Sequence, residues 1–217
     1  MDAPPFEVRL ELDGWDLFWA LLEVVPGRDA ELADLRRAVA DQARADFRLE
    51  TLASHPTAAA LRALFKAAGC SPSRYRPSSE ALLRRLLKGA ELPAIHPLVD
   101  LNNCLSATLA VPCCVSAEGT VTPPITLRAG REEEAYESLR GPFNLHRKPI
   151  VADAEGPFDT PITGSRRVKV GPKTRRAWLV AYLPRGVVRG EEAEAALRDL
   201  VARAPAAKVE HPSVSTA

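Results

Sequence analysis

The sequence feature that most constrains the fold is a change of residue pattern at Pro112. Between residues 29 and 109, apolar residues recur at spacings of three and four, as on one face of a helix. After Pro112, short β-branched and apolar runs alternate with turn residues. Helices and strands in separate blocks are typical of an α+β fold. Since no linker is long or polar enough to divide the chain, we predict a single α+β domain over residues 1–205.

Four helices are predicted before Pro112. Three of them have apolar stripes over residues 32–47, 61–68 and 82–87, and the last two of these stripes end at glycines. A fourth helix is expected from Pro97, because Leu98, Leu101, Leu105 and Leu109 share a face. It places Asn102 and Asn103 in its middle, where asparagine has a poor helix propensity. These two residues therefore call for a specific explanation.

Strands are predicted at both ends of the chain. Residues 6–12 alternate and residues 17–25 form an apolar run, which indicates a hairpin or two separate early strands. Further strands are expected at 113–116, 121–122, 125–127, 150–152, 167–170 and 177–182, with a short acidic helix at 131–139 and a closing helix ending near 204. Residues 206–217 are expected to be a disordered tail.

Composition excludes several classes of protein. With 29 basic and 28 acidic residues, the chain has no global field for nucleic acid, so any RNA contact is local. The four cysteines show no metal-binding spacing, and no signal peptide or membrane span fits the first residues. We expect reduced thiols, a cytoplasmic location, no cofactor and no metal. Sequence alone leaves the oligomeric state open.

Common catalytic motifs are missing from the sequence. It has no GxSxG, glycine-rich phosphate loop or HExxH, which disfavours elbow-type serine hydrolases, nucleotide hydrolases and zincins. Several short polar stretches remain, at residues 73–77, 95–103, 130–132 and 151–157. Any chemistry is expected to come from these stretches.

At these stretches the chain resembles the editing region of the bacterial phenylalanyl-tRNA synthetase β subunit, formed by its third and fourth modules, and that region's free-standing relatives. The resemblance covers about residues 70–185 and is carried by residues 71–87, 92–93, 98–103, 128–132, 139–141 and 150–155. It implies a β-sandwich-like core of unusual topology flanked by helices. Nothing resembles the amino-acid-activating domain, so ligase activity is not expected.

The resemblance implies a function in translation quality control. The synthetase region hydrolyses tyrosine mischarged onto the phenylalanine tRNA, so we expect a trans-editing aminoacyl-tRNA deacylase. An aminoacyl ester is already activated, and a positioned water with oxyanion donors suffices. The alternatives are a non-catalytic module that binds an amino acid or a tRNA acceptor end, and a small-ester hydrolase with a cysteine nucleophile. Neither DNA nor a membrane is an expected partner.

The resemblance also supplies candidate catalytic residues. The family pocket uses a polar residue and an asparagine that match Asn102 and Asn103. The alternative is that these two asparagines only tie down neighbouring backbone. Where the synthetase has a histidine thought to hold the water, this chain has Cys114. The alternatives for Cys114 are a nucleophile, a pocket-lining residue and a core residue. His96, just before the asparagine helix, is a substitute for that histidine or a capping residue.

Substrate-binding residues are expected after Arg140. Glu155 falls about where the family places the glutamate that recognises the tyrosine hydroxyl, or it is a solvated turn residue. Asp153 is a weaker candidate, because aspartates at strand ends often cap turns. Gly141 would give backbone access at the pocket wall or form a plain turn.

Two basic sets are candidates for contact with tRNA phosphates. One comprises Arg166, Arg167, Lys169, Lys173, Arg175 and Arg176, and the other comprises Arg74, Arg76, Arg84 and Arg85. The alternative is that they are solvated strand edges and helix faces.

Overall fold

The computed structural model describes residues 4–216, and its centre is a four-stranded antiparallel sheet. The strand order is β10-β2-β9-β3, with bounds β2 (Trp15–Val24), β9 (Arg176–Pro184), β3 (Cys113–Ala117) and β10 (Ala207–Ser215). Both faces of this central sheet are buried. In β2, Phe18 and Leu22 enter the core on one face, while Leu17 and Trp19 enter a second core on the other. Successive side chains point to opposite faces, so a strand with two buried faces has a continuous apolar sequence.

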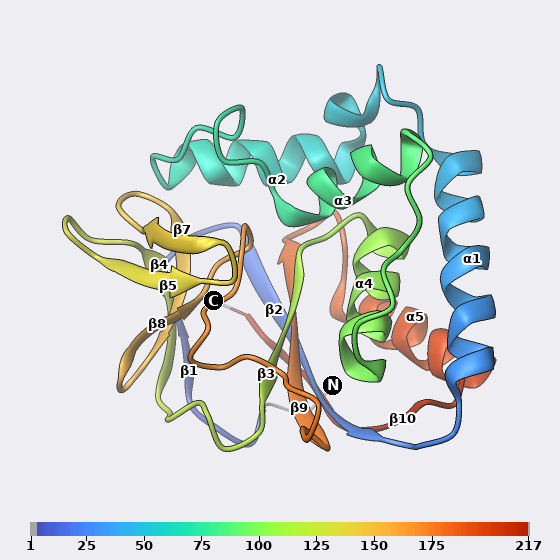
Figure 1. Ribbon diagram of the computed structural model, residues 1–217. Helices are drawn as coiled ribbons and strands as arrows, with labels where there is room; N and C mark the ends of the chain where they lie inside the picture. The colour runs from blue at the N-terminus through green and yellow to red at the C-terminus, as the bar shows by residue number, and fades with distance from the viewer. Residues whose placement is uncertain (1–3, 217) are drawn as a thin grey trace.

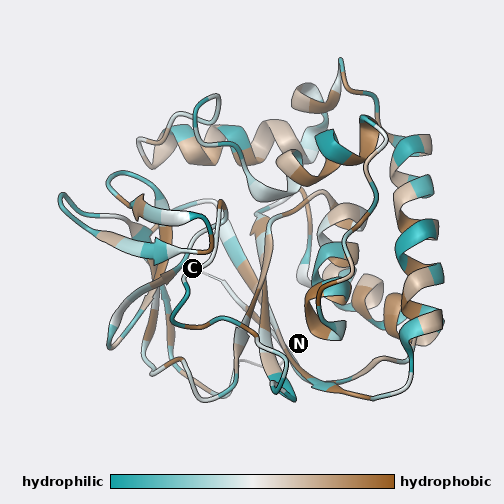
Figure 2. Cartoon of the chain, viewed as in Figure 1, coloured by the Kyte–Doolittle hydropathy of each residue, from teal (hydrophilic) through white to brown (hydrophobic). Residues whose placement is uncertain are grey.

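Helices cover one face of the central sheet (Figure 1). This layer contains α1 (Asp29–Asp46), α3 (Ser78–Leu87), α4 (Pro97–Leu109) and α5 (Gly190–Arg203). Figure 2 shows α1 with teal and brown stretches along its length, as expected for a helix with one buried side. The short helix η1 (Leu52–Ser54) leads into α2 (Pro56–Ala67), whose Leu61 and Phe65 belong to the core on the opposite face.

A second sheet packs against that opposite face. Its order is β1-β4-β7-β8, with bounds β1 (Val8–Leu10), β4 (Ile125–Ala129), β7 (Pro149–Asp153) and β8 (Gly156–Asp159). A separate hairpin joins β5 (Ala135–Ser138) to β6 (Gly141–Asn144). Because the two sheets share one apolar core that includes Trp15, Phe158 and Tyr182, the expected α+β fold with a sandwich-like core is confirmed.

The two early strands do not form a hairpin. β1 pairs in parallel with β4 in the second sheet, while β2 pairs with β9 and β10 in the central sheet. The turn between them contains Gly14, whose φ of 80° is easily adopted only by glycine. Residues 13–14 therefore connect two different sheets, and the alternative of two separate early strands is confirmed.

The prediction of an acidic helix at residues 131–139 is wrong. Arg128 makes two hydrogen bonds to Glu134, at 2.8 and 2.7 Å, and the chain continues as β5. Arg128, which binds Glu134, lies outside the expected helix. Local helix propensity therefore does not determine the conformation of this segment. Residues 121–122 and 167–170 are not strands, and neither β6 nor β8 was predicted from the residue pattern.

The prediction of a disordered tail is wrong for the residues of the tail that the structure describes. Residues 207–215 form β10, the edge strand of the central sheet that pairs with β2. The pairing shifts register between Glu210 and Ser213, around His211 and Pro212. This irregularity explains why no strand pattern was recognised there. Ala217 lies outside the described residues.

Asp100 fixes the start of α4, the helix that carries the two asparagines. One carboxylate oxygen accepts hydrogen bonds from the backbone N–H groups of Ile95 (2.9 Å) and His96 (3.3 Å). The other oxygen forms an ion pair with Arg36 of α1. Asp100 is buried, so these contacts hold α4 against α1.

We expect Asp100→Ala to lower the free energy of unfolding by about 3 kcal/mol, because it leaves Arg36 and two N–H groups without their acceptor. Urea unfolding followed by circular dichroism measures this. Asp34→Ala is the matched control, since Asp34 is exposed and pairs only with Arg37 on the same helix. A change below about 0.5 kcal/mol is expected for the control. Equal effects in the two variants would contradict the role of Asp100.

Candidate functional site

A cavity of about 350 Å³ lies beside the edge strand β3, and we call it the α4 cavity. Its wall combines residues of α3, α4 and β3 with the turn between β5 and β6 and with the segment from Asp159 to Val170. The polar part of the wall includes Asn102, Asn103, Cys114 and Asp159. Its apolar part includes Val99, Val115, Leu139, Ile162 and Val168. Such a mixed wall suits a small ligand with one polar and one apolar end.

A second hollow of about 370 Å³ adjoins the α4 cavity, and we call it the arginine groove. The two share Arg85, Asn103, Cys113, Arg140 and Ile162 as lining residues. The groove is also lined by Arg74 and Arg76, and none of its lining residues is acidic. Within residues 4–216, the exposed side chains of Arg74, Arg85 and Arg140 have no carboxylate partner. These guanidinium groups are therefore available to an anionic ligand.

Asn102 and Asn103 face the α4 cavity from the middle of α4. The side-chain amide of Asn102 donates to the carbonyl oxygen of Cys113 (3.3 Å) and thereby ties α4 to β3. The Oδ1 atom of Asn102 is buried and has no hydrogen-bond donor within the described chain. Asn103 is less buried and lines both the cavity and the groove. Asn102 thus has a structural bond in addition to its place in the wall.

Asp159 is a buried carboxyl at the end of β8 that the sequence analysis did not single out. Its Oδ2 accepts a hydrogen bond from the Tyr182 hydroxyl (2.6 Å), while its Oδ1 has no donor with hydrogen-bond geometry within residues 4–216. The Cys114 thiol and the Thr160 N–H nevertheless lie close enough to the carboxyl to affect its pKa. Burial raises the pKa of this carboxyl to about 7, and the neighbouring Cys114 thiol and Tyr182 hydroxyl act in the opposite direction. Asp159 is therefore held close to its titration point near neutral pH.

The environment of Cys114 disfavours a nucleophilic role. Burial, followed by the negative charge of Asp159, raises the pKa of its thiol well above the usual range. The thiolate is the reactive form of cysteine, and an activated cysteine needs a lowered pKa. Cys114 does line the α4 cavity, as the pocket-lining alternative predicts.

The loop after Asp159 is held in place by its own hydrogen bonds. The Thr160 hydroxyl donates to the carbonyl of Thr163 (2.9 Å) and accepts from the N–H groups of Ile162 and Thr163. Tyr136 of β5 also donates to the carbonyl of Thr163. Ile162 and Thr163 line the α4 cavity, so this part of the wall is well ordered.

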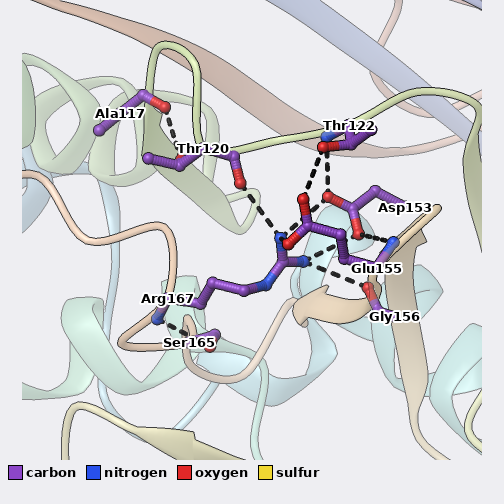
Figure 3. A network of polar contacts seen from close by, with 8 residues as sticks. All are labelled: Ala117, Thr120, Thr122, Asp153, Glu155, Gly156, Ser165 and Arg167. Atoms are coloured by element: carbon purple, nitrogen blue, oxygen red, sulfur yellow. Dashed lines mark hydrogen bonds and ion pairs between the residues drawn. The ribbon is translucent and has the colours of Figure 1, made fainter.

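Asp153 and Glu155 do not line the α4 cavity and instead bind Arg167 (Figure 3). The Arg167 guanidinium is 2.9 Å from Asp153 and 3.3 Å from Glu155. The buried Asp153 carboxylate also accepts from the N–H of Thr122 (2.9 Å). This network joins the segment before β4, the turn after β7 and the segment after β8. The two acids predicted to bind substrate therefore take part in an ion-pair network that holds these three segments together.

Two further candidates also lie outside the α4 cavity. His96 caps α4, since its Nδ1 accepts from the N–H of Leu98 (3.3 Å), and its Nε2 lies 3.2 Å from the carbonyl of Thr174. Gly141 begins β6 next to Arg140, with its carbonyl bonded to the Ser138 hydroxyl (2.7 Å). The structure brings Asn102, Asn103 and Cys114 together but not His96 or Gly141.

The basic candidates are distributed over several places. Arg74 and Arg76 line the arginine groove, and Lys169 lines the α4 cavity. Arg166 donates to the carbonyl of Ser138 (3.2 Å), and Arg176 is paired with Glu118 and Glu210. Arg175 borders a different hollow, beside His96. The basic run at 166–176 therefore does not form one surface.

Asp159 and Arg140 are the site residues that sequence reasoning missed. Arg85 was among the basic candidates for tRNA contact, with a solvated helix face as the alternative, and it lines both hollows. Arg140 follows a leucine that is exposed in the structure, and that Leu139-Arg140 pair is an unusual turn composition. Asp159 follows Phe158 in a strand that was not recognised. Of the residues missed, only Arg140 lay in a segment that had been singled out, because residues 139–141 carry part of the family resemblance.

The fold is an α+β domain with a cavity next to an arginine-lined groove, which is an arrangement that suits the binding of a small ligand with an anionic part. The family comes from sequence comparison. The family model for the B3/4 domain matches residues 60–204, about two thirds of the chain. The chain therefore belongs to the B3/4 domain family. This confirms the resemblance to the phenylalanyl-tRNA synthetase β subunit.

Among solved structures, one similar chain is an N-terminal fragment of the phenylalanyl-tRNA synthetase β subunit from Pyrococcus horikoshii. The sequence identity is 11%, and the TM-score is 0.49. The match covers 100% of this chain and 56% of that fragment. No curated protein gave a significant sequence match. Among residues 4–216, no helix is long and apolar enough to cross a membrane.

The raised pKa of Asp159 has a consequence for stability. Between pH about 4 and 7 the folded protein keeps a proton that the unfolded chain has released, so this carboxyl's contribution to stability falls as pH rises through that window. Asp159→Asn removes the titration but retains an oxygen that can accept from Tyr182. We expect the variant to gain stability relative to the wild type as pH rises, by on the order of a few kcal/mol.

Urea unfolding of both proteins at several pH values between about 5 and 8 measures the difference. Carboxyl groups common to the two proteins cancel, so the pH dependence of the difference reports on Asp159 alone. A difference that stays constant over this range would show that Asp159 titrates at its ordinary pKa.

Proposed function

We propose that this protein hydrolyses the ester of an amino acid mischarged on tRNA, acting in trans. One observation carries the proposal: the α4 cavity, with its amide and carboxyl groups, opens beside the acid-free arginine groove. An aminoacylated tRNA end has a matching arrangement, with an amino acid on one side of the terminal ribose and phosphates on the other. Membership of the B3/4 family supports this assignment.

The arginine groove suits the tRNA end. Arg74, Arg85 and Arg140 offer forked donors that match phosphate oxygens. Tyr75 and Phe143 also line the groove, with ring centroids 6.0 Å apart in an edge-to-face arrangement. An aromatic face can stack on an unpaired base such as the terminal adenine. Lys148 Nζ lies 4.0 Å from the centroid of the Tyr75 ring and 5.4 Å from that of Phe143, so a base would stack on a face that this ammonium group leaves open.

The α4 cavity suits the amino acid and its ester. Water adds to the ester carbonyl, the bond from the carbonyl carbon to the ribose oxygen breaks, and that oxygen leaves with a proton. Asn103 lines both hollows, so its amide is placed to donate to the carbonyl oxygen as negative charge develops. The apolar residues Val99, Leu139 and Val168 would contact the side chain of the amino acid.

A panel of tRNAs charged with correct and incorrect amino acids tests the reaction. We expect the wild-type protein to release at least one amino acid, and Asn103→Ala to slow that release about 100-fold through loss of an oxyanion donor. Asn144→Ala is the matched control, since Asn144 is exposed on β6 and lines neither hollow. The measurement is acid-precipitable radioactive amino acid against time.

The outcomes of this panel separate the alternative functions. Binding of charged tRNA without release would favour a non-catalytic module. Release that iodoacetamide abolishes, and that small esters also support, would favour the cysteine hydrolase. Release that Asn103→Ala leaves unchanged would place the reaction elsewhere.

The arginine groove makes a separate prediction about tRNA affinity. Arg85→Ala and Arg140→Ala should each weaken binding and each reduce the slope of log affinity against log salt by about 1. Arg198→Ala is the matched control, because Arg198 is exposed on α5 and paired with Glu194. Filter binding at several salt concentrations measures the slopes. An equal loss in all three variants would refute a local phosphate site.

A further inference from the structure

Two buried oxygen atoms in the residues that line the α4 cavity have no donor with hydrogen-bond geometry within residues 4–216, although the weak thiol donor of Cys114 and the N–H of Thr160 lie near the Asp159 carboxyl. The two oxygen atoms are Oδ1 of Asp159 and Oδ1 of Asn102, in residues that are 1% and 6% exposed. A buried acceptor left unsatisfied costs about 1 to 3 kcal/mol, and a carboxylate costs more. Two such acceptors in one wall are therefore a feature that a bound ligand would relieve by bringing hydrogen-bond donors.

The arrangement around Asp159 fixes the chemistry of that donor. Its other oxygen is already occupied by Tyr182, at 2.6 Å, so one oxygen remains for a ligand. Asn102 uses its amide nitrogen on the Cys113 carbonyl, so it too offers only an acceptor. Acceptors on both residues, one of them able to carry negative charge, favour a group that has several N–H donors and a positive charge.

The rest of the cavity wall limits the ligand further. Ile95, Val99, Leu139, Ile162 and Val168 are apolar. A ligand that satisfies the two acceptors and the apolar residues thus has a cationic amine at one end and an apolar side chain at the other, while Arg85, Arg140 and Lys169, which also line the wall, suit the anionic phosphates of the tRNA end. An α-amino acid ester with an aliphatic or aromatic side chain has both.

We propose that the α4 cavity selects substrates with a free α-ammonium group and an apolar side chain, and that Asp159 is the specificity residue that binds the ammonium group. The inference rests on the proposed function, since it specifies which feature of an aminoacyl ester the cavity reads. Acylation of the amine removes its charge and places a carbonyl oxygen near the two acceptors. N-acylated aminoacyl-tRNA, the chemical class of peptidyl-tRNA, is therefore rejected.

One tRNA charged with one amino acid provides the test, with half of the sample chemically N-acetylated. The amino acid is the one released fastest in the panel above, or leucine if none is released. We expect the wild-type protein to hydrolyse the free-amine ester at least about 100-fold faster than the acetylated ester, since a site built for a polar group strongly rejects an analogue without it. This comparison needs no variant, so it does not depend on how a variant folds.

Two variants then assign the selection to Asp159. Asp159→Asn should lose most of the preference for the free amine. Gly164→Ala leaves the carboxyl in place but adds a Cβ 3.4 Å from Asp159 Oδ1 and 4.0 Å from Cys114 Sγ, so it should weaken the preference by obstruction. Asp41→Asn is the control for the same chemical change, because Asp41 is exposed on α1, and it should keep the full preference.

A binding measurement gives a readout that does not require turnover. Leucinamide should bind in calorimetry, while N-acetyl-leucinamide and 4-methylpentanamide, which lacks the amine, should bind at least about 100-fold more weakly. An ammonium group beside Asp159 lowers the pKa of that carboxyl, so leucinamide should release protons near pH 6.5. The titratable groups that influence Asp159 are Cys114, Tyr182 and Tyr136, all with pKa values raised by burial. They stay protonated there, and the release should vanish in Asp159→Asn.

The outcomes distinguish this inference from the proposed function. Hydrolysis of both esters at similar rates would overturn the inference and leave the deacylase function intact. Selective binding of leucinamide with no hydrolysis of any ester would support the inference and remove the deacylase function. Equal binding of leucinamide and its acetylated form, or an unchanged preference in Asp159→Asn, would also overturn the inference.

Discussion

The burial of both faces of the central sheet is the constraint on which the rest of the structure depends. β2 and β9 supply side chains to two cores, one under the helices and one under the second sheet. Polar groups in the middle of these strands would need buried partners, so functional groups are confined to edges and connecting loops. β3 is one edge of the sheet, and the α4 cavity lies beside it.

Helix α4 converts that edge into a site. Its start is fixed to α1 by the contact between Asp100 and Arg36, and its middle is fixed to β3 by the bond from Asn102 to Cys113. Asn103, one residue further, is then held at the junction of the α4 cavity and the arginine groove. The buried carboxyl of Asp159 lies in the wall of the cavity, and the exposed guanidinium groups of Arg85 and Arg140 line both the cavity and the groove.

The candidate site could be predicted in part. Asn102, Asn103 and Cys114 were expected together and do line one cavity, because they belong to a helix and to the strand that follows it directly. Glu155 and Asp153 were expected there too, but Arg167 binds both. A carboxylate in a turn binds whichever cation the fold brings near it, and sequence spacing does not reveal that choice. Asp159 was missed because its burial depends on contacts with β9 and β3.

The sequence by itself determined the helices, the two-block α+β organisation and the family, because periodicity and local motifs are properties of neighbouring residues. Tertiary structure alone decided that β1 and β2 enter different sheets, that residues 207–215 close the central sheet and that Asp159 faces the site. Each of these depends on partners far away in the chain. The free energy of burial and of strand pairing between such partners arises only in the complete fold, so it cannot be inferred from a short segment.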